Sequence, residues 1–429
     1  MTVPETAPGT ECSFFNKLLL KRMVRKMKED AQKGTILSQL LDITQVKWFS
    51  RWLMIGFLCQ SVLIGGGYAT GRELVEFFMM HGLLQGLYGM AVSTFCFALI
   101  GILTFDYARQ FHLYNYRSFF QSLLPGSSWL VFEVGYIFLV VLVGGILSSA
   151  AGTILQQWFG VSYWVGVTIL LVGTSALLFA GGKAISTILS YWSFYLYAVM
   201  FIFLAVAIRH FGMDGVFGNM LRNHDITENT NWVMGGIKYT LYNMVSFLLV
   251  LYALKDTIKT RRDAVINGIV SSIVMMIPAS IEYLAMVPAY PSILQDPVPV
   301  FSILKNDLGG GVLLSAYVLM LFGTSIETIT GFVHGLNERI NSVYQEKGRE
   351  MSPRTRGLVG FFVLVVCFIS AKVGLVALIA RGYSFMAWYF LFVMVLPLVT
   401  VGLMRLRGKE IAPVSISQNL EEVKVHVEP

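Results

Sequence analysis

The first apolar segment of the chain is interrupted by three consecutive glycines, in the stretch Leu63-Ile64-Gly65-Gly66-Gly67-Tyr68-Ala69-Thr70-Gly71-Arg72-Glu73. Three glycines cost a helix about 3 kcal/mol relative to alanine. Glycines that serve close packing between helices are the alternative interpretation. A contiguous run favours unwound backbone, which a membrane tolerates only where it is buried or lines a cavity. The stretch therefore predicts a break whose carbonyls suit a cation and whose amides suit a carboxylate.

The composition indicates the class of protein. Of 429 residues, 55% are hydrophobic and 13% are charged, and the mean hydropathy is +0.66. An ordinary soluble protein is about 25% charged. So few charges cannot cover a water-soluble surface, which excludes a soluble globular enzyme and a disordered chain. Because about 20 apolar residues span a bilayer as a helix, the length fits a membrane protein with roughly ten to twelve spans.

Ten apolar segments are predicted to be membrane spans. They cover approximately residues 48–79, 83–108, 129–157, 161–180, 184–208, 231–254, 263–289, 311–340, 357–373 and 376–404. With the N-terminus inside, most lysines and arginines fall in the inner loops, and the outer loops hold only Arg209, Arg222, Lys305 and Lys372. Positive charge concentrates on the cytoplasmic side of membrane proteins. We therefore expect both termini, including the polar tail 405–429, in the cytoplasm.

Residues 1–47 form a basic tail. Apolar residues such as Phe15, Leu19 and Met23 recur at helical spacing, and lysines and arginines occupy the other side. This pattern predicts an amphipathic helix on an anionic lipid surface. The alternative is a solvated tail whose periodicity is accidental. The formal net charge of +7 also suits nucleic acid, but the basic residues lie in the tail and in short loops, so we expect no nucleic-acid partner.

The two halves of the 48–404 core share the same order of spans. Spans 1 and 6 carry glycines or polar residues in mid-membrane, and spans 3 and 8 are both long. Because five is odd, the second half enters the membrane from the opposite face, as in the inverted repeats of secondary transporters. We therefore predict an all-α integral membrane protein of 5+5 inverted helices. Its repeats cover about 48–208 and 231–404, and its spans 1 and 6 are discontinuous.

Spans 6 and 8 carry polar groups near the centre of the membrane. In span 6, Asn243 offers a donor and an acceptor, and Tyr242 offers a ring and a hydroxyl. Packing is the alternative role for this pair. In span 8, one helical face carries three hydroxyls, at Thr324, Ser325 and Thr328. Three hydroxyls can supply neutral oxygen ligands to Na⁺, unless they bond the backbone of their own helix.

Charged residues inside the spans are candidates for a gate or for proton coupling, at Arg72, Glu73, Glu282 and Glu327. Buried charges in a span are costly and usually functional. Arg72 and Glu73 follow the glycines and suit an outer gate, and a salt bridge that only fixes span 1 is the alternative. Glu282 and Glu327 are the best candidates for a carboxylate that carries a proton, or are static partners of nearby polar groups.

The stretch 65–73, together with His334-Gly335-Leu336-Asn337-Glu338-Arg339, resembles the bacterial YkvI-like membrane proteins over about residues 48–404. These proteins are similar to the branched-chain amino-acid:cation symporters and the neurotransmitter:sodium symporters, which share the LeuT-type fold. The resemblance implies a sodium site that combines carbonyls of span 1 with groups of span 8, at Ser61, Ile64, Leu321, Thr324 and Ser325. Tyr68 replaces an asparagine whose side chain serves another sodium site in the sodium symporters.

We therefore expect a symporter of the bacterial cytoplasmic membrane that imports a small organic solute, an amino acid or related zwitterion, driven by Na⁺ through alternating access. The solute would lie between the breaks of spans 1 and 6, against Gly65, Gly66, Gly67, Tyr68, Tyr242 and Asn243. One alternative is proton coupling through Glu282 or Glu327. Another, of a different class, is a non-transporting receptor or scaffold. We expect no enzyme activity, because the sequence shows no nucleophile–base pair and no metal cluster at span depth, and we expect no cofactor. No phosphate loop is present in the sequence, which indicates that ATP is not the energy source. The oligomeric state is not predicted.

Overall fold

The computed structural model describes residues 47–64, 68, 70–180, 182–222, 231–346, 348–349 and 351–408. Two units, Met1–Met54 and Ile55–Pro429, are described separately. The first unit contains helix α3 (Lys47–Trp52), where the guanidinium of Arg51 lies 4.7 Å from the centre of the Trp52 ring. The predicted amphipathic helix of the basic tail lies outside the described residues, as do residues 409–429 of the C-terminal tail.

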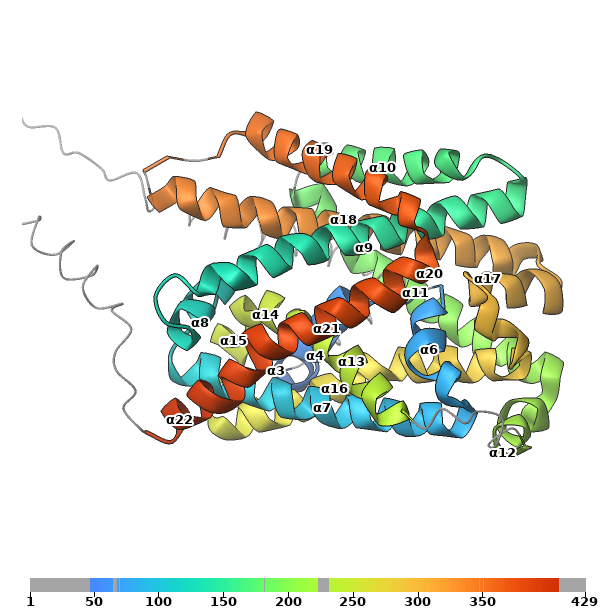
Figure 1. The fold of residues 1–429 in the computed structure, drawn as a ribbon, viewed down its shortest axis with the longest axis horizontal. Helices are drawn as coiled ribbons and strands as arrows, with labels where there is room; N and C mark the ends of the chain where they lie inside the picture. Colours follow the sequence, from blue (N-terminus) through green and yellow to red (C-terminus); the bar gives the residue numbers. More distant parts are fainter. Residues whose placement is uncertain are drawn as a thin grey trace, which may run out of the picture. The chain divides into compact units, whose positions relative to one another are not determined.

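The second unit is built from helices, and no strand occurs in its described ranges (Figure 1). The first half contains α4 (Met54–Leu63), α6 (Arg72–Phe77), α7 (Leu83–Gln110), α8 (Tyr116–Leu123), α9 (Trp129–Phe159), α10 (Tyr163–Ala180), α11 (Gly182–Met213) and α12 (Asn219–Arg222). The second half contains α13 (Trp232–Asn243), α14 (Val245–Leu249), α15 (Leu251–Thr257), α16 (Arg261–Met286), α17 (Pro299–Ser302), α18 (Gly311–Glu346), α19 (Pro353–Ser370), α20 (Leu375–Ala377), α21 (Ser384–Phe390) and α22 (Leu403–Leu406). Short helical turns connect some of them, namely η1 (Met79–His81), η2 (Asp214–Gly218), η3 (Val287–Ala289), η4 (Ser292–Gln295), η5 (Ile303–Asp307), η6 (Ala371–Val373), η7 (Leu378–Tyr383), η8 (Leu391–Val395) and η9 (Leu398–Gly402).

Seven helical stretches in the described part of the chain are long and apolar enough to cross a membrane. They are Leu83–Gln110, Trp129–Phe159, Tyr195–Gly218, Arg261–Ala289, Gly311–Asn341, Arg354–Val373 and Leu375–Leu406. Two shorter apolar helices cover Met54–Leu63 and Tyr163–Leu178. The short helices α13, α14 and α15 occupy the sixth predicted segment. Helical structure thus covers each of the ten apolar segments, and the inverted order of the ten stays a prediction.

Helices α7, α13 and α16 pack together as one group, with α7 and α16 running side by side in Figure 1. A Cβ atom at Gly268 of α16 would lie 2.7 Å from the backbone nitrogen of Ile102 on α7, so only glycine allows this approach. On the other side of α7, Ser93 Oγ donates to the carbonyl of Gly236 on α13 at 2.8 Å. The hydroxyl of Thr240 donates back to the carbonyl of Ser93 at 3.2 Å. Backbone contacts of this kind hold the three helices as a unit.

The helix surfaces that face away from this packing are apolar. Helix α19 exposes large side chains at the positions i, i+3, i+4, i+7, i+8 and i+11, namely Leu358, Phe361, Phe362, Val365, Val366 and Ile369. That spacing places them on one face of the helix. A contiguous exposed apolar face is unfavourable in water and is suited to lipid.

Candidate functional site

The first span departs from helix on both sides of the predicted break, at Ile64 and at Gly71, while Tyr68 between them is helical. Helix α4 ends at Leu63 and Ile64 is not helical. The chain then turns at Gly71, whose φ of 78° and ψ of −9° are left-handed, and α6 begins at Arg72. A Cβ atom at Gly71 would also lie 2.6 Å from the sulfur of Met286, so a side chain is excluded there. Gly65, Gly66 and Gly67 lie outside the described residues, so their predicted contact with a solute stays a prediction.

The sixth predicted span is interrupted as well. Helix α13 ends at Asn243, α14 begins at Val245, and a second interruption at Val250 separates α14 from α15. Tyr242 and Asn243 end α13, but Met244 after them keeps helical angles (φ −64°, ψ −14°) and donates its amide to the carbonyl of Thr240 at 2.9 Å, so the clearer departure from helix is at Val250 (φ −101°, ψ 3°). The two interrupted spans meet at a cavity.

A small central cavity of about 30 Å³ lies among the interrupted helices. It is lined by residues of α4, α6, α9, α13, α14, α18 and η7, namely Val62, Leu63, Glu73, Leu139, Val143, Tyr242, Asn243, Val245, Ser246, Thr328, Phe332 and Tyr383. One water molecule occupies about 30 Å³ in the liquid. The cavity therefore has room for one group of that size, and the conformation is closed around it.

Glu73 is the charged residue in the lining of this cavity. It is buried, and its Oε2 accepts a hydrogen bond of 2.5 Å from the hydroxyl of Tyr242. Tyr383 of η7 also donates to this carboxylate. The rings of Tyr242 and Tyr383 stack with centres 4.1 Å apart and planes 9° apart. Two hydroxyls on two stacked rings thus fix the carboxylate at the wall of the cavity.

Asn243 and Ser246 line the cavity but direct their donor groups to the backbone. Asn243 Nδ2 donates to the carbonyl of Tyr239 at 3.1 Å. Ser246 Oγ donates to the carbonyl of Asn243 at 2.8 Å. The structure thus brings the predicted pair Tyr242 and Asn243 to the cavity, and their contact with a solute stays a prediction.

The residues predicted to bind sodium differ in whether their polar groups already have hydrogen-bond partners. Thr324 Oγ1 accepts a hydrogen bond of 3.1 Å from Trp192 Nε1, while Ser325 Oγ is buried and has no partner among the described residues. Ser61 Oγ donates to the carbonyl of Leu58 at 2.9 Å, which does not test the predicted ligand at Ser61, its backbone carbonyl. Ile64 donates its amide to Gln60, and Leu321 is fully buried. Within the described ranges no hydrogen bond joins α4 to α18 at these predicted ligands. The sodium site stays a prediction.

Glu282 of α16 belongs to a second buried polar cluster. It is 2% exposed, and its Oε2 has no hydrogen-bond partner in the described part of the chain. The hydroxyls of Tyr68 and Tyr239 are buried and equally without a described partner, and both tyrosines lie within electrostatic range of Glu282 and Glu73. Glu327 is half-buried on α18 and does not line the central cavity. Three unpartnered buried polar groups in one place are costly unless a proton, a water or an ion satisfies them.

Arg72 holds a segment that follows α16 against the start of α6. Its Nη1 donates to the carbonyls of Leu294 at 2.8 Å and Asp296 at 3.1 Å, and its Nη2 pairs with Glu76 at 2.9 Å. The amide of Val300 donates to the carbonyl of Thr70 at 3.2 Å. The 291–300 segment is thus bonded on both sides of Gly71, and the role of Arg72 in an outer gate stays a prediction.

Two sets of contacts between segments are called locks below. The first is the set of Arg72 contacts, and the second lies near the start of α9. Arg339 of α18 donates to Glu133 Oε1, and its guanidinium lies 5.1 Å from the centre of the Trp129 ring. At the other end of α9, Lys305 of η5 donates to the carbonyl of Gln157 at 2.6 Å, and η5 follows the 291–300 segment closely. At 1.5 Å per residue, Glu133 and Gln157 are about 36 Å apart along the helix. The Lys305–Gln157 and Arg339–Glu133 contacts are therefore separated along α9 by roughly the thickness of a bilayer.

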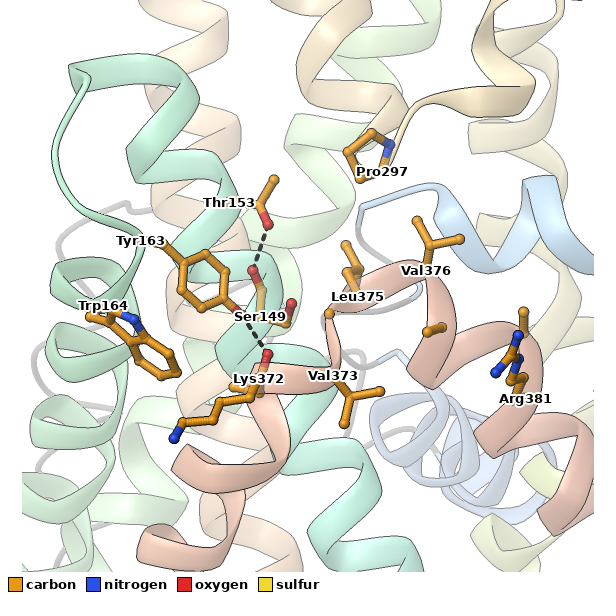
Figure 2. Close-up of a pocket in the computed structure, with 14 residues that line it drawn as sticks. Ser149, Thr153, Tyr163, Trp164, Pro297, Lys372, Val373, Leu375, Val376 and Arg381 are labelled. Carbon is orange, nitrogen blue, oxygen red and sulfur yellow. Dashed lines mark hydrogen bonds between the residues drawn. The ribbon is translucent and has the colours of Figure 1, made fainter.

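A larger cavity of about 740 Å³ lies beside the 291–300 segment, with Pro297 in its wall. Figure 2 shows Ser149 and Thr153 of α9, Tyr163 and Trp164 of α10, and residues 371–381 around it. The hydroxyl of Tyr163 donates to the carbonyl of Ala371 at 2.8 Å. Lys372 and Arg381 lie at different ends of this cavity (Figure 2). The sequence pattern did not point to it, because its lining comes from segments far apart in the chain.

The chain is similar in sequence to known proteins. No protein-family model matches the chain. The chain is 20% identical over 332 residues to the membrane protein YkvI of Bacillus subtilis (strain 168), covering 77% of this chain and 90% of YkvI. It is 22% identical over 333 residues to YyaD of the same organism, covering 75% and 88%.

Solved structures also resemble it. An Na⁺-coupled sialic acid symporter in a substrate-bound, outward-open state matches with a TM-score of 0.56 and 12% identity, covering 81% of this chain and 78% of the symporter. A manganese transporter of Eremococcus coleocola matches with a TM-score of 0.43 and 12% identity, covering 88% and 91%. The predicted resemblance is confirmed: the chain is a helical membrane protein similar in sequence to YkvI and similar in fold to an Na⁺-coupled symporter.

Proposed function

We propose that this protein is a secondary active transporter that imports a small organic solute, an amino acid or related zwitterion, with Na⁺ by alternating access. The observation that carries the proposal is the closed central cavity, lined by polar groups at the ends of two interrupted spans. Transporters of this architecture bind their solute near the bilayer midplane, at discontinuous helices between inverted repeats. The proposal includes the 5+5 inverted order of the ten spans.

The packing supports a rocking motion of one group of helices. Spans 1, 2, 6 and 7 would move together, and they correspond to α4 with α6, α7, α13–α15 and α16. The close backbone contacts of α7 with α13 and with α16 suit a group that moves as a rigid body. The remaining spans would form the frame against which this group rocks.

The two locks define the order of events. The Arg72 contacts would open toward the predicted outer face to admit the solute, and the Arg339–Glu133 pair would open toward the cytoplasm to release it. Both locks are closed in this structure, which fits an occluded intermediate. Opening one lock while the other stays closed is the requirement of alternating access.

Na⁺ is the proposed coupling ion because span 8 offers hydroxyl oxygens without partners. Ser325 Oγ and Thr328 Oγ1 are buried and accept no hydrogen bond from the described residues. Neutral oxygens are the ligands that hard cations prefer. The fold similarity to an Na⁺-coupled symporter agrees with this proposal.

Proton coupling is a second candidate, and a specific observation favours it. Glu282 is a buried carboxylate with a free oxygen, beside two unpartnered tyrosine hydroxyls. An intramembrane carboxylate of this kind is a common carrier of a coupling proton. A receptor or scaffold of the same fold remains the candidate of another class.

Uptake into proteoliposomes tests these candidates. The purified full chain would be given a mixture of labelled amino acids under an inward Na⁺ gradient, an inward proton gradient, or neither. We expect Na⁺ to stimulate uptake, and we expect Thr324→Ala combined with Ser325→Ala to remove the stimulation. Thr400→Ala is the matched control, because the Thr400 hydroxyl bonds the carbonyl of Leu396 on its own helix. Uptake that is indifferent to Na⁺ in the wild type would rule out sodium coupling. A chain that transports nothing and retains a stable protein partner in a pull-down supports the scaffold.

A further inference from the structure

The lining of the central cavity contains one acidic residue and no basic residue. Among the twelve residues that line it, Glu73 is acidic and none is lysine, arginine or histidine. Charges inside a membrane span persist only where a partner compensates them. The two tyrosine hydroxyls stabilise the carboxylate but do not neutralise it. A cationic group in the cavity would supply the missing charge.

The hydrogen-bonding groups of this lining point to the same conclusion. Tyr242 and Tyr383 already donate their hydroxyl hydrogens to Glu73. Asn243 and Ser246 already donate to backbone carbonyls. What these groups retain is mainly acceptor capacity, because an ionised carboxylate has about four lone-pair positions and hydroxyl and amide oxygens have two each. The free donors of the lining are the second N–H of Asn243 and the hydroxyl of Thr328, which has no partner among the described residues. Since acceptors outnumber donors, a ligand with several donors fits such a lining, and a protonated primary amine has this chemistry.

The remaining walls distinguish an organic cation from an inorganic one. Aromatic rings lie beside the carboxylate: Tyr242 stacks on Tyr383 in the lining, and the ring of Phe77, outside the lining, lies 5.4 Å from that of Tyr242. Phe332 and five aliphatic side chains complete the lining. A bare metal ion prefers oxygen ligands on all sides. Aromatic faces attract an ammonium group, and aliphatic walls favour its alkyl part.

We propose that the protein recognises its cargo through a protonated primary amine that binds Glu73 between Tyr242 and Tyr383, and that a carboxylate on the cargo is not required. This inference rests on the proposed transport function and narrows its substrate class. The cavity of about 30 Å³ matches the ammonium head alone, so the lining must open to admit the alkyl part. Primary alkylammonium ions, and not only amino acids, then bind at this site.

Thermal stabilisation of the purified full chain in detergent tests the proposal. The probes are the primary alkylammonium ions from methyl to hexyl, glycine, 4-aminobutyrate, tetramethylammonium and the carboxylates acetate and propionate, each in NaCl and in KCl. We expect at least one primary amine without a carboxylate to raise the Tm, whereas acetate and propionate leave it unchanged. Tetramethylammonium, which has no N–H donor, should be at least tenfold weaker than the best primary amine.

The variant Glu73→Gln keeps the shape of the side chain and removes its charge. We expect it to raise the half-saturating amine concentration at least tenfold. Glu73→Asp, which keeps the charge, should retain the preference for amines even if it folds less stably. Asp214→Asn is the control, because Asp214 is exposed and pairs with Arg222 away from the cavity. Equal stabilisation by propionate, an unchanged response in Glu73→Gln, or no response of the wild type to any amine would each overturn the inference.

The failure of this inference differs from the failure of the proposed function. If labelled solutes without an amine are taken up, and Glu73→Gln transports them normally, the protein is a transporter and the amine proposal is wrong. If proteoliposomes take up no solute of any class, the transport function itself is wrong, whatever binds to the detergent-solubilised protein.

Discussion

Removing the Arg72 side chain should free the 291–300 segment without unfolding the rest of the chain. Arg72→Ala deletes the two hydrogen bonds that Nη1 donates to the carbonyls of Leu294 and Asp296. The ion pair with Glu76 lies within α6 and does not hold the segment. A hydrogen bond from a charged donor contributes about 1.5–3 kcal/mol. Since the acceptors are only partly buried, the lower value applies, and two bonds amount to about 3 kcal/mol.

Hydrogen exchange measured by mass spectrometry reports this loss of stability in the 291–300 segment. The amide of Val300 is the best reporter, because it donates across to Thr70 rather than to its own segment. At about 1.4 kcal/mol for each factor of ten, a loss of about 3 kcal/mol speeds local opening roughly 100-fold. Arg72→Lys keeps the charge but not the planar, multi-donor head, so we expect an intermediate increase.

Arg222→Ala is the matched control, since Arg222 is exposed and its pair with Asp214 is screened by solvent. It should leave exchange in the 291–300 segment unchanged. If Arg72→Ala alters exchange at Val300 by less than about threefold, the segment is held by other contacts and the gate assignment fails. If exchange increases equally in α7, the substitution has destabilised the whole bundle, and the idea of a local gate is refuted.

Further changes probe the packing and the second polar cluster. Gly268→Leu should lower the stability by about 1–3 kcal/mol, seen as a reduced Tm, because its side chain would strike the backbone of Ile102. Gly331→Ala, where nothing lies within 4 Å of the added Cβ, should leave the Tm unchanged or slightly raised; equal losses in both variants would disprove the close-packing explanation. Glu282→Gln should abolish uptake driven by a proton gradient and spare exchange of labelled for unlabelled solute if Glu282 carries a proton. Uptake driven by a proton gradient at the wild-type rate in Glu282→Gln would exclude that role.

The sequence predicted the helical segments well because lipid imposes a simple rule. A span must be long, apolar and internally hydrogen-bonded, and each of these properties is local. The Leu83–Gln110 helix, for example, was expected at 83–108. The interruption of span 1 was also predictable, since helix propensity is a property of neighbouring residues and the glycines stand together. The sequence indicated the cavity shared by spans 1 and 6 less clearly, through the polar pair Tyr242 and Asn243 in span 6.

The composition of the site was not predictable in the same way. Tyr383 was missed because its contact with Glu73 joins residues that are far apart in the chain, and one tyrosine in an apolar span has no periodic signal. Glu73 was grouped with Arg72 as a gate because the two are adjacent. Neighbouring residues on a helix point about 100° apart, so Arg72 reaches the 291–300 segment while Glu73 faces the cavity. Adjacency in sequence thus concealed two different roles.

The placement of these two residues on one short helix has a thermodynamic consequence. Helix α6 contains six residues and is bounded by non-helical backbone at Gly71 and Phe78, so it can shift as a unit. A cargo that binds Glu73 and a segment that binds Arg72 then act on the same element. Coupling between two such contacts is reciprocal. If closure of the 291–300 segment strengthens amine binding by some factor, the amine must slow exchange at Val300 by the same factor, and Arg72→Ala must weaken amine binding correspondingly. The change in amine affinity and the change in exchange at Val300 would then be two measurements of one coupling free energy, transmitted through α6.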